Sequence, residues 1–383
     1  MRVVMNGLIT LKPKTGVGHY VAELYAAMRK LPDVECSLYP GERIRSHRVG
    51  TAKGGTTSQL KSIFQRIGQT ALPWHFAAYT RVFQFDVYHE PNFVPFESRL
   101  PTVATVHDLS VVKFPQWHPA ERVARHEKEF LSGLRRAARI ITVSEAVRQE
   151  VIEDLGIAPG KVTAIHNGIG TRFAPQSAEA IAVVRRKYTL PERFFLTVGT
   201  VEPRKNLGMV MRAFADLPAD VRSKCPLILA GPWGWRAEAE REFFESAGQA
   251  AGIRQLGYVP AADLPALYSA ARVLLYPSHY EGFGLPPLEM LGCGGAVLAS
   301  FADAVREVLA GHGELIDPND LSAWRISMLT AATDGEFIQQ LRNSGIAHAG
   351  GFTWDRCARE TAKVYQIAEP RQSMANDTAL NKP

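Results

Sequence analysis

A short segment between residues 278 and 289 has the residue types that hold a phosphorylated ligand: it reads SHYEGFGLPPLE. It follows a β-type run at residues 273–276 and begins a helix, where two consecutive prolines suit the first turn because no N–H partner is lost there. Glycines at positions 282 and 284 let a ligand approach the backbone, and free amides at a helix N-terminus attract phosphate. The amides exposed in this way belong to Phe283, Gly284 and Leu285.

A carboxylate stands on each side of this turn. Glu281 precedes the turn, and Glu289 lies about one turn into the helix. Because like charges repel, neither carboxylate suits the phosphate itself. Each suits the hydroxyl groups of a ribose or a sugar, which donate hydrogen bonds to carboxylate oxygens. The alternative is a plain strand–helix turn with an exposed glutamate at each end; the combination of glycines, prolines and carboxylates favours the ligand site.

A second segment, at residues 197–206, reads TVGTVEPRKN and follows another β-type run. Arg204 and Lys205 therefore stand in a loop at the C-terminal end of a strand, which is where parallel sheets bind ligands. The arginine fork and the lysine point charge together suit a diphosphate. Alone, the pair would be an exposed basic turn; together with the turn at residues 278–289, it predicts a diphosphate clamp.

Three weaker signals accompany these two. Gly16 and Gly18 precede a helix and leave room for a phosphate or a sugar, although a simple tight turn explains them almost as well and the dinucleotide-binding fingerprint is incomplete. His107 directly follows a β-type run, where it either binds a substrate hydroxyl or satisfies a loop carbonyl. Ser144 and Asn167 end two other runs, and we interpret them as a helix cap and a turn residue.

Composition and missing motifs exclude several classes of protein. With 46% hydrophobic and 21% charged residues the chain is globular, and no apolar run reaches the ~18–20 residues of a membrane span. The four cysteines lack metal or disulfide spacing, which favours a reducing compartment. Walker A, Asp-x-Asp and Gly-x-Ser-x-Gly motifs are absent, so basic side chains and amides, rather than a metal ion, must neutralise a diphosphate. The net charge of +6 fits a phosphorylated ligand, an anionic membrane surface or nucleic acid, although charge alone favours a solvated basic surface without a partner.

The elements that position these residues form two series in which β-type and helix-like runs alternate. Alternation of this kind predicts parallel sheets, so the fold class is α/β with two doubly wound, Rossmann-like domains. The expected strands are residues 2–5, 34–38, 87–89, 102–106, 140–143 and 162–165, then 194–198, 227–230, 253–256, 273–276, 296–299 and 314–316. The clearest expected helices are residues 18–31, 119–138 and 145–155, and LPER at residues 190–193 separates the two series.

The order of these motifs resembles the retaining GT-B glycosyltransferases of family 4, over residues 2 to 367. The resemblance implies an acceptor-side domain at residues 1–188, a nucleotide-sugar domain at 189–350, and a central cleft between them. It also implies a helix at 351–368 that crosses back to the first domain, while 369–383 is a polar tail that we expect to be disordered. Residues 86–96 (DVYHEPNFVPF) and 105–110 (TVHDLS) resemble bacterial mannosyltransferases of polysaccharide assembly.

The resemblance also assigns roles to the residues that match its motifs. Arg204 and Lys205 would bind the donor diphosphate and stabilise the departing nucleoside diphosphate without a metal. Glu281 would contact donor-sugar hydroxyls, Glu289 the ribose, and His107 the C6 side of the sugar. The remaining matches would line the donor site or the acceptor site: Gly16, Gly18, Phe283, Gly284 and Leu285, with Tyr258 and Val259 at the base. The family often has a Pro-Glu pair after residues 296–299; the pair is missing here, and Glu307 receives no role.

These roles predict a metal-independent hexosyltransferase that needs no cofactor. We expect GDP-mannose as the donor, front-face attack with retention, and a saccharide acceptor linked to a polyprenyl diphosphate. We expect a cytoplasmic protein, peripheral at the inner face of the cell membrane. One alternative is a nucleotide-sugar epimerase of the GT-B type, which would need no acceptor; another is a nucleic-acid-binding protein, which the scattered basic residues and the absence of any module motif disfavour.

Residues 43–76 fit the alternation poorly and suit an interfacial helix. Basic and apolar residues are interleaved there: Arg43, Arg45, Arg48, Lys53, Lys61 and Arg66 with Ile63, Phe64, Ile67, Leu72, Trp74 and Phe76. The stretch either docks on an anionic membrane or packs on the first domain with its basic residues in solvent.

Overall fold

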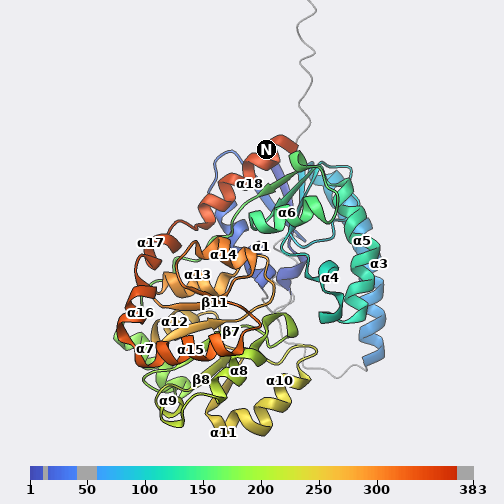
Figure 1. Cartoon of the computed structure of the whole chain (residues 1–383). Coiled ribbons are helices and arrows are strands. Elements are labelled where there is room, and N and C mark those ends of the chain that lie inside the picture. Colours follow the sequence, from blue (N-terminus) through green and yellow to red (C-terminus); the bar gives the residue numbers. More distant parts are fainter. Residues whose placement is uncertain (12–15, 41–57, 369–383) are drawn as a thin grey trace, which may run out of the picture.

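The computed structural model describes residues 1–11, 16–40 and 58–368. Within these residues the chain forms two parallel β-sheets of six strands each, flanked by helices (Figure 1). All twelve predicted strands are present, and their ends differ from the prediction by at most one residue. The predicted α/β class with two Rossmann-like domains is therefore confirmed.

The first sheet has the strand order β2-β1-β3-β4-β5-β6, and every neighbouring pair is parallel. Its strands are β1 (Arg2–Asn6), β2 (Glu35–Tyr39), β3 (Val87–Glu90), β4 (Thr102–Val106), β5 (Arg139–Thr142) and β6 (Val162–Ala164). Its helices are α1 (Gly16–Met28), α3 (Ser58–Phe83), α4 (Ser110–Lys113), α5 (Ala120–Arg136) and α6 (Glu145–Glu153). Helix α7 (Ala178–Tyr188) follows them in sequence but packs in the core of the second sheet. The order reverses direction between β1 and β3, so the loops after these two strands frame a crevice.

The second sheet has the order β12-β11-β10-β7-β8-β9, which is the Rossmann order when counted from β7. Its strands are β7 (Phe195–Val198), β8 (Leu227–Ala230), β9 (Ile253–Gly257), β10 (Val273–Tyr276), β11 (Val297–Ser300) and β12 (Glu314–Ile316). The helices that follow β7 in sequence are α8 (Leu207–Ala215), α9 (Ala219–Lys224), α10 (Glu238–Phe243), α11 (Gln249–Ala251), α12 (Leu264–Ala270), α13 (Leu285–Gly292), α14 (Asp303–Leu309), α15 (Leu321–Thr333), α16 (Gly335–Arg342), α17 (Gly345–Ala349) and α18 (Trp354–Ala368). The switch point falls between β7 and β10.

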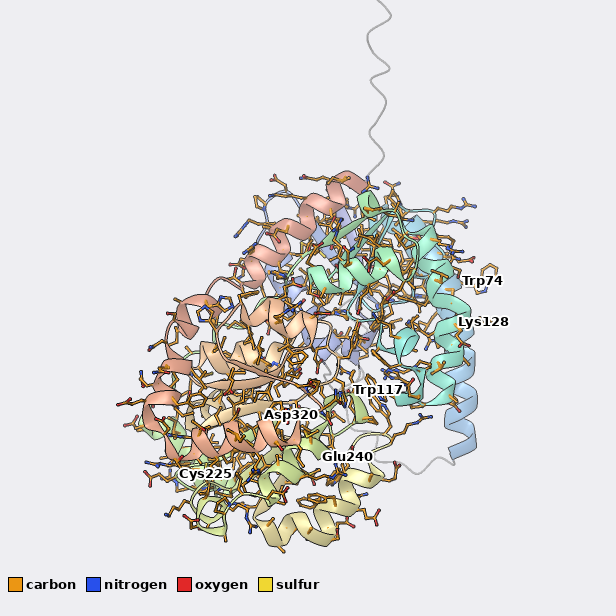
Figure 2. The ribbon with its side chains drawn as sticks, viewed as in Figure 1. Trp74, Trp117, Lys128, Cys225, Glu240 and Asp320 are labelled. Atoms are coloured by element: carbon orange, nitrogen blue, oxygen red, sulfur yellow. The ribbon has the colours of Figure 1, made fainter. Side chains whose placement is uncertain are left out.

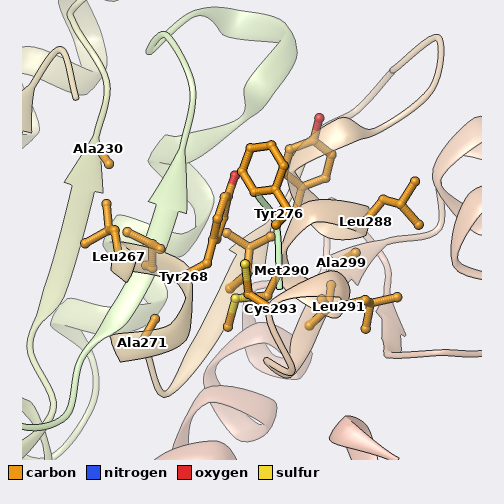
Figure 3. Packing of buried hydrophobic residues seen from close by; sticks show 14 of the residues in the cluster. Ala230, Leu267, Tyr268, Ala271, Tyr276, Leu288, Met290, Leu291, Cys293 and Ala299 are labelled. Atoms are coloured by element: carbon orange, nitrogen blue, oxygen red, sulfur yellow. The ribbon is translucent and has the colours of Figure 1, made fainter. Parts of the chain in front are cut away.

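Burial on both faces explains why the sequence shows these strands as continuous apolar runs. Strands β8, β10 and β11 are buried at every residue. On one side of this sheet, α12 and α13 pack together through Leu267, Tyr268, Leu288 and Met290 (Figure 3). Helix α13 begins at the predicted phosphate turn. The packing of this helix against α12 therefore fixes the position of the turn.

The last helix, α18, packs against the first sheet although it follows the second one in sequence (Figure 1). Its Trp354 and Cys357 lie in one core cluster with Val3 of β1. The hydroxyl of Tyr365 lies 2.6 Å from Nδ1 of buried His89 in β3. Residues 369–383, the expected tail, lie outside the described residues.

Helix α3 occupies part of the segment that fits the alternation poorly. It contains Pro73 and buries Phe76 in a cluster with Tyr39 and Tyr88 of the first sheet. Trp74, by contrast, is 81% exposed and projects from the edge of the molecule in Figure 2. Residues 41–57 and the side chains of residues 58–70, which include most of the predicted basic stretch, lie outside the described residues.

Candidate active site

The two predicted halves of the phosphate clamp meet at the switch point of the second sheet. Arg204 and Lys205 lie in a 3-10 turn (Pro203–Lys205) after β7, and Glu281 lies in the loop after β10. Strands β7 and β10 are parallel neighbours, so their C-terminal ends open to the same edge. Nη1 of Arg204 donates to Oε2 of Glu281 at 2.5 Å, and Nζ of Lys205 donates to Oε1 at 2.6 Å.

The charges in the clamp are strongly coupled. Burial alone would raise the pKa of Glu281, but Arg204 and Lys205 outweigh it and lower the pKa to about 2. Burial lowers the pKa of Lys205, and the charge of Glu281 opposes that shift. Nζ of Lys205 also donates to the hydroxyl of Tyr276 at 3.0 Å. The clamp is thus a preformed group of buried charges and is not an exposed basic turn.

Glu202 belongs to the same group, and the sequence analysis gave it no role. Nη2 of Arg204 donates to its Oε1 at 2.8 Å, while its Oε2 is buried without a hydrogen-bond partner. Two carboxylates therefore offset the two cations. Arg204 uses one further donor on the carbonyl of Tyr280. Arg204 therefore keeps two of its five N–H donors for a ligand. Lys205 keeps one of its three.

The turn before α13 has the predicted geometry. Gly284 is the N-cap residue with φ of 103°, a conformation that favours glycine, and prolines occupy the first turn of the helix. Inside that helix, Oε2 of Glu289 accepts a hydrogen bond of 2.9 Å from the hydroxyl of Tyr268. Burial raises the pKa of Glu289 to about 7, although Tyr268 and Arg172 act in the opposite direction. Figure 3 shows Tyr268 beside Tyr276 in the core that supports both carboxylate sites.

His107 satisfies a loop carbonyl, as one of its two interpretations has it, and its contact with the donor sugar stays a prediction. Its Nε2–H donates to the carbonyl oxygen of Pro91 at 2.8 Å, and its ring packs edge-on to Tyr20. Burial lowers its pKa, so the ring is neutral at pH 7 and Nδ1 remains an acceptor. Its neighbour Asp108, which had no assigned role, accepts two hydrogen bonds from Ser110.

The loop that carries Glu281 rests directly on the first domain. A Cβ at Gly282 would come within 1.7 Å of the carbonyl oxygen of His107, so only glycine fits. Ser144 caps α6 as predicted, and its hydroxyl also donates to the carbonyl of Gly282 at 2.8 Å. The hydroxyl of Tyr280 accepts from the amide of Leu109 at 2.9 Å. The first domain therefore helps to hold the loop that carries Glu281 in place.

Glu307 forms a second bridge between the domains. Its carboxylate accepts hydrogen bonds from the amides of Glu145 and Ala146 at 2.8 and 2.9 Å, at the N-terminus of α6. Nε2 of His166 lies 2.6 Å from the same carboxylate. More than 160 residues separate Glu307 from the amides, so local sequence gave no signal for this contact.

A cleft of about 2420 Å³ lies between the domains and joins these groups. The predicted residues that line it are Gly16, His107, Arg204, Lys205, Glu281, Phe283, Gly284, Leu285 and Glu289. Both predicted glycines lie in the first turn of α1 rather than in a loop before it, and Gly18 does not line the cleft because it is buried, whereas Gly16 is exposed. Tyr258 and Val259 do not line it either: Tyr258 is 66% exposed, and Val259 is buried in the core. From the same stretch, Ala261 and Leu264 reach the cleft.

Comparison with known proteins identifies the architecture. Residues 14–173 match the family model "Glycosyltransferase Family 4", and residues 180–348 match "Glycosyl transferases group 1". The chain is 32% identical to O-antigen chain mannosyltransferase B of Escherichia coli, over 93% of this chain and 97% of that relative. This chain is a family 4 glycosyltransferase. The transferase therefore has the family and the enzyme class that its motifs predicted.

Solved structures agree on the fold. The transferase superposes on sucrose-phosphate synthase of Thermosynechococcus elongatus with a TM-score of 0.74 at 20% identity, covering 95% of this chain and 98% of that one. It superposes on Anabaena HepE, in a complex with UDP-glucose, with a TM-score of 0.71 at 18% identity, covering 96% and 99%. The GT-B arrangement of two Rossmann-like domains is thus shown.

The described residues also bear on metal ions and on membranes. In the part of the chain that the structure describes, no cluster of three or more His, Cys, Asp or Glu side chains could hold a metal ion. None of the helices among these residues is long and apolar enough to cross a membrane.

Proposed function

We propose that the transferase moves mannose from GDP-mannose to a hydroxyl of a saccharide acceptor, with retention of configuration and without a metal ion. The clamp that Arg204, Lys205 and Glu281 form at the switch point carries the proposal. Similarity to an O-antigen chain mannosyltransferase supports mannose as the sugar. The clamp offers charge-assisted donors where the family holds a nucleotide diphosphate.

In this proposal the donor lies across the turn before α13. The unused donors of Arg204 and Lys205, with the amides of Phe283, Gly284 and Leu285, bind the diphosphate. Glu289 accepts hydrogen bonds from the ribose hydroxyls. Glu281 aligns the two cations through its ion pairs and contacts the donor sugar.

The reaction breaks the bond between C1 of the sugar and the phosphate oxygen, and the acceptor oxygen forms its bond to C1 on the same face. The departing phosphate oxygen takes the acceptor proton. Arg204 and Lys205 stabilise the negative charge that develops on the leaving group. Since its ion pairs lower the pKa of Glu281 to about 2, this carboxylate is a weak nucleophile, which supports front-face attack over a covalent intermediate.

We further propose a polyprenyl-diphosphate-linked acceptor, met from the cytosol at the inner face of the membrane. Exposed apolar side chains on α3 support this docking, since Trp74 and Val82 are 81% and 72% exposed. Phe76 does not take part, because it packs on the first sheet. An exposed aromatic on a helix that also carries basic residues in its sequence suits an anionic lipid surface.

A thermal-shift screen tests the donor. At a hundredfold excess over Kd, a ligand of the folded state adds about 2.7 kcal/mol, which raises the midpoint by several degrees. GDP-mannose and GDP should produce this shift, whereas UDP-glucose and UDP-GlcNAc should not. Stabilisation by a UDP-sugar in place of GDP-mannose would contradict the proposed donor.

A further inference from the structure

One face of α5 lines the cleft beyond the donor clamp. Residues that line it recur every three or four positions, so they share one side of the helix. Along one stripe these are Arg122, Arg125, Glu129, Ser132 and Arg136, and Glu121, His126 and Lys128 of the same helix line the cleft beside them. Fourteen residues of helix span about 21 Å. The cleft volume of about 2420 Å³ also exceeds the roughly 300–1,000 Å³ of a pocket for one small ligand. The face therefore has room for a second, extended ligand.

His118 stands where this face meets the reaction site. It directly precedes the N-cap of α5, lines the cleft and is only 4% exposed. Neither ring nitrogen makes a hydrogen bond of good geometry, although the backbone of Ser110 acts on the ring and raises its pKa. Buried polar groups in proteins are normally paired, so an orphaned ring at a cleft points to a missing ligand. Burial and then the charge of Arg122 lower the pKa of His118, so the neutral ring offers one donor and one acceptor. A sugar hydroxyl also donates and accepts.

The surroundings of His118 connect it to the donor side. Asp108 and Arg204 both act on its charge, and all three side chains line the same cleft. Its ring centroid lies 6.3 Å from that of Trp235, whose Nε1 donates to the carbonyl of Trp117 at 2.8 Å. Figure 2 shows Trp117 where the two domains meet. An acceptor hydroxyl bound by His118 would therefore lie next to the transferred sugar.

The charges along the face favour a saccharide over a phosphate chain. Nε of Arg125 lies 3.5 Å from a carboxylate oxygen of Glu129, so the basic residue is paired on the helix itself. Glu97 and Glu121 also line this part of the cleft. Mixed carboxylates and guanidinium groups accept from and donate to sugar hydroxyls, whereas repeated carboxylates would repel phosphates. The ring of Phe93 also lines the cleft and lies 5.9 Å from that of His126, which adds aromatic surface.

We propose that the acceptor binds along this face as an extended saccharide, with the reacting hydroxyl held at His118. We name the surface formed by His118, Arg122, Arg125, Glu129, Ser132 and Arg136 the α5 track. The inference rests on the proposed function and adds that the enzyme recognises several sugars of its acceptor. His118 binds the terminal sugar of the acceptor. The arginines toward Arg136 bind the sugars that precede the terminal one in the acceptor chain.

Equilibrium binding of mannose oligosaccharides, without any donor, tests the track. Titration calorimetry with mannobiose and mannotetraose should show tighter binding of the longer chain. His118→Phe should weaken both by about tenfold, the value of one hydrogen bond. The double variant Arg125→Ala/Arg136→Ala should weaken only mannotetraose. Arg135→Ala is the matched control, because this arginine lies on the same helix outside the cleft lining.

The outcomes separate this inference from the proposed function. Failure of the wild type to bind mannotetraose, equal affinity for the two lengths, or unchanged affinity in His118→Phe would each overturn the track. Thermal melting checks that His118→Phe is folded, and the surface double variant provides a second measurement if it is not. Oligosaccharide binding with no response to GDP-mannose would instead remove the proposed donor and leave the track in place.

Discussion

Protonation of Glu289 should control donor affinity near neutral pH. Burial raises the pKa of this carboxyl to about 7, whereas an ordinary glutamate titrates near 4.3. The ionised form offers both oxygens to the ribose hydroxyls, and the protonated form loses one acceptor. Affinity for a nucleotide sugar should therefore be full above pH 8 and should fall as the pH drops through 7. With a pKa of about 7, the Kd at pH 6 should be about tenfold that at pH 8.

Calorimetric titration with GDP-mannose from pH 6 to pH 8 measures this effect. The nucleotide sugar is suitable because its diphosphate has no ionisation in that range, whereas the terminal phosphate of free GDP titrates near pH 6. Glu90, which lines the cleft from the first domain, also has its pKa raised by burial to about 7, so the wild type alone does not assign the effect. The variant Glu289→Gln assigns the pH effect, because it removes the carboxyl of residue 289 and leaves that of Glu90 intact.

Glu289→Gln should bind GDP-mannose with a nearly constant Kd that is close to that of the wild type at pH 6. Glu336→Gln, at an exposed helix position outside the cleft lining, should retain the wild-type profile. A flat profile in the wild type, or the wild-type slope in Glu289→Gln, would refute the ribose role of this carboxylate.

Further predictions concern the clamp, metal ions and the membrane. Lys205→Met should lower kcat/KM for the donor by roughly ten- to a hundredfold, because one charge-assisted hydrogen bond is lost, and near-normal kinetics would contradict the clamp. Arg204→Ala should lose about 3–5 kcal/mol of unfolding free energy, because Glu202 and Glu281 lose their shared partner. Urea denaturation should show that Glu202→Gln restores part of this loss, and no recovery would argue against charge balance as its cause. Donor turnover should persist in EDTA, and activity that returns only with Mg²⁺ or Mn²⁺ would contradict metal independence. The chain should co-sediment with anionic vesicles and less so at high salt or with Trp74→Ala, whereas binding that ignores lipid charge would remove the docking proposal.

The sequence predicted the strands and the clamp for the same physical reason. Parallel strands covered on both faces are continuous apolar runs, so their ends could be placed within one residue. Neighbouring parallel strands end at the same edge of a sheet, so polar residues that directly follow two such strands lie close together there. Arg204 and Glu281 meet in this way, although 77 residues separate them.

Contacts between distant side chains could not be predicted. Tyr268 and Tyr276 belong to apolar stretches and were indistinguishable from other core residues, yet their hydroxyls bind Glu289 and Lys205. Glu202 had a local signal, since it lies two residues before an arginine in a turn, but pairing depends on the turn geometry. His107 had two interpretations from its position, and only the structure places its N–H on the carbonyl of Pro91.

Transfer itself tests the central claim most directly. The transferase is incubated with GDP-mannose and a mannose oligosaccharide in EDTA, and NMR reads the product and the configuration of its new bond. The donor is α-linked, so retention at the clamp of Arg204 and Lys205 predicts a new α-mannosyl bond that Lys205→Met forms far more slowly. A β-linked product, or no transfer from GDP-mannose by the wild type, would contradict the account.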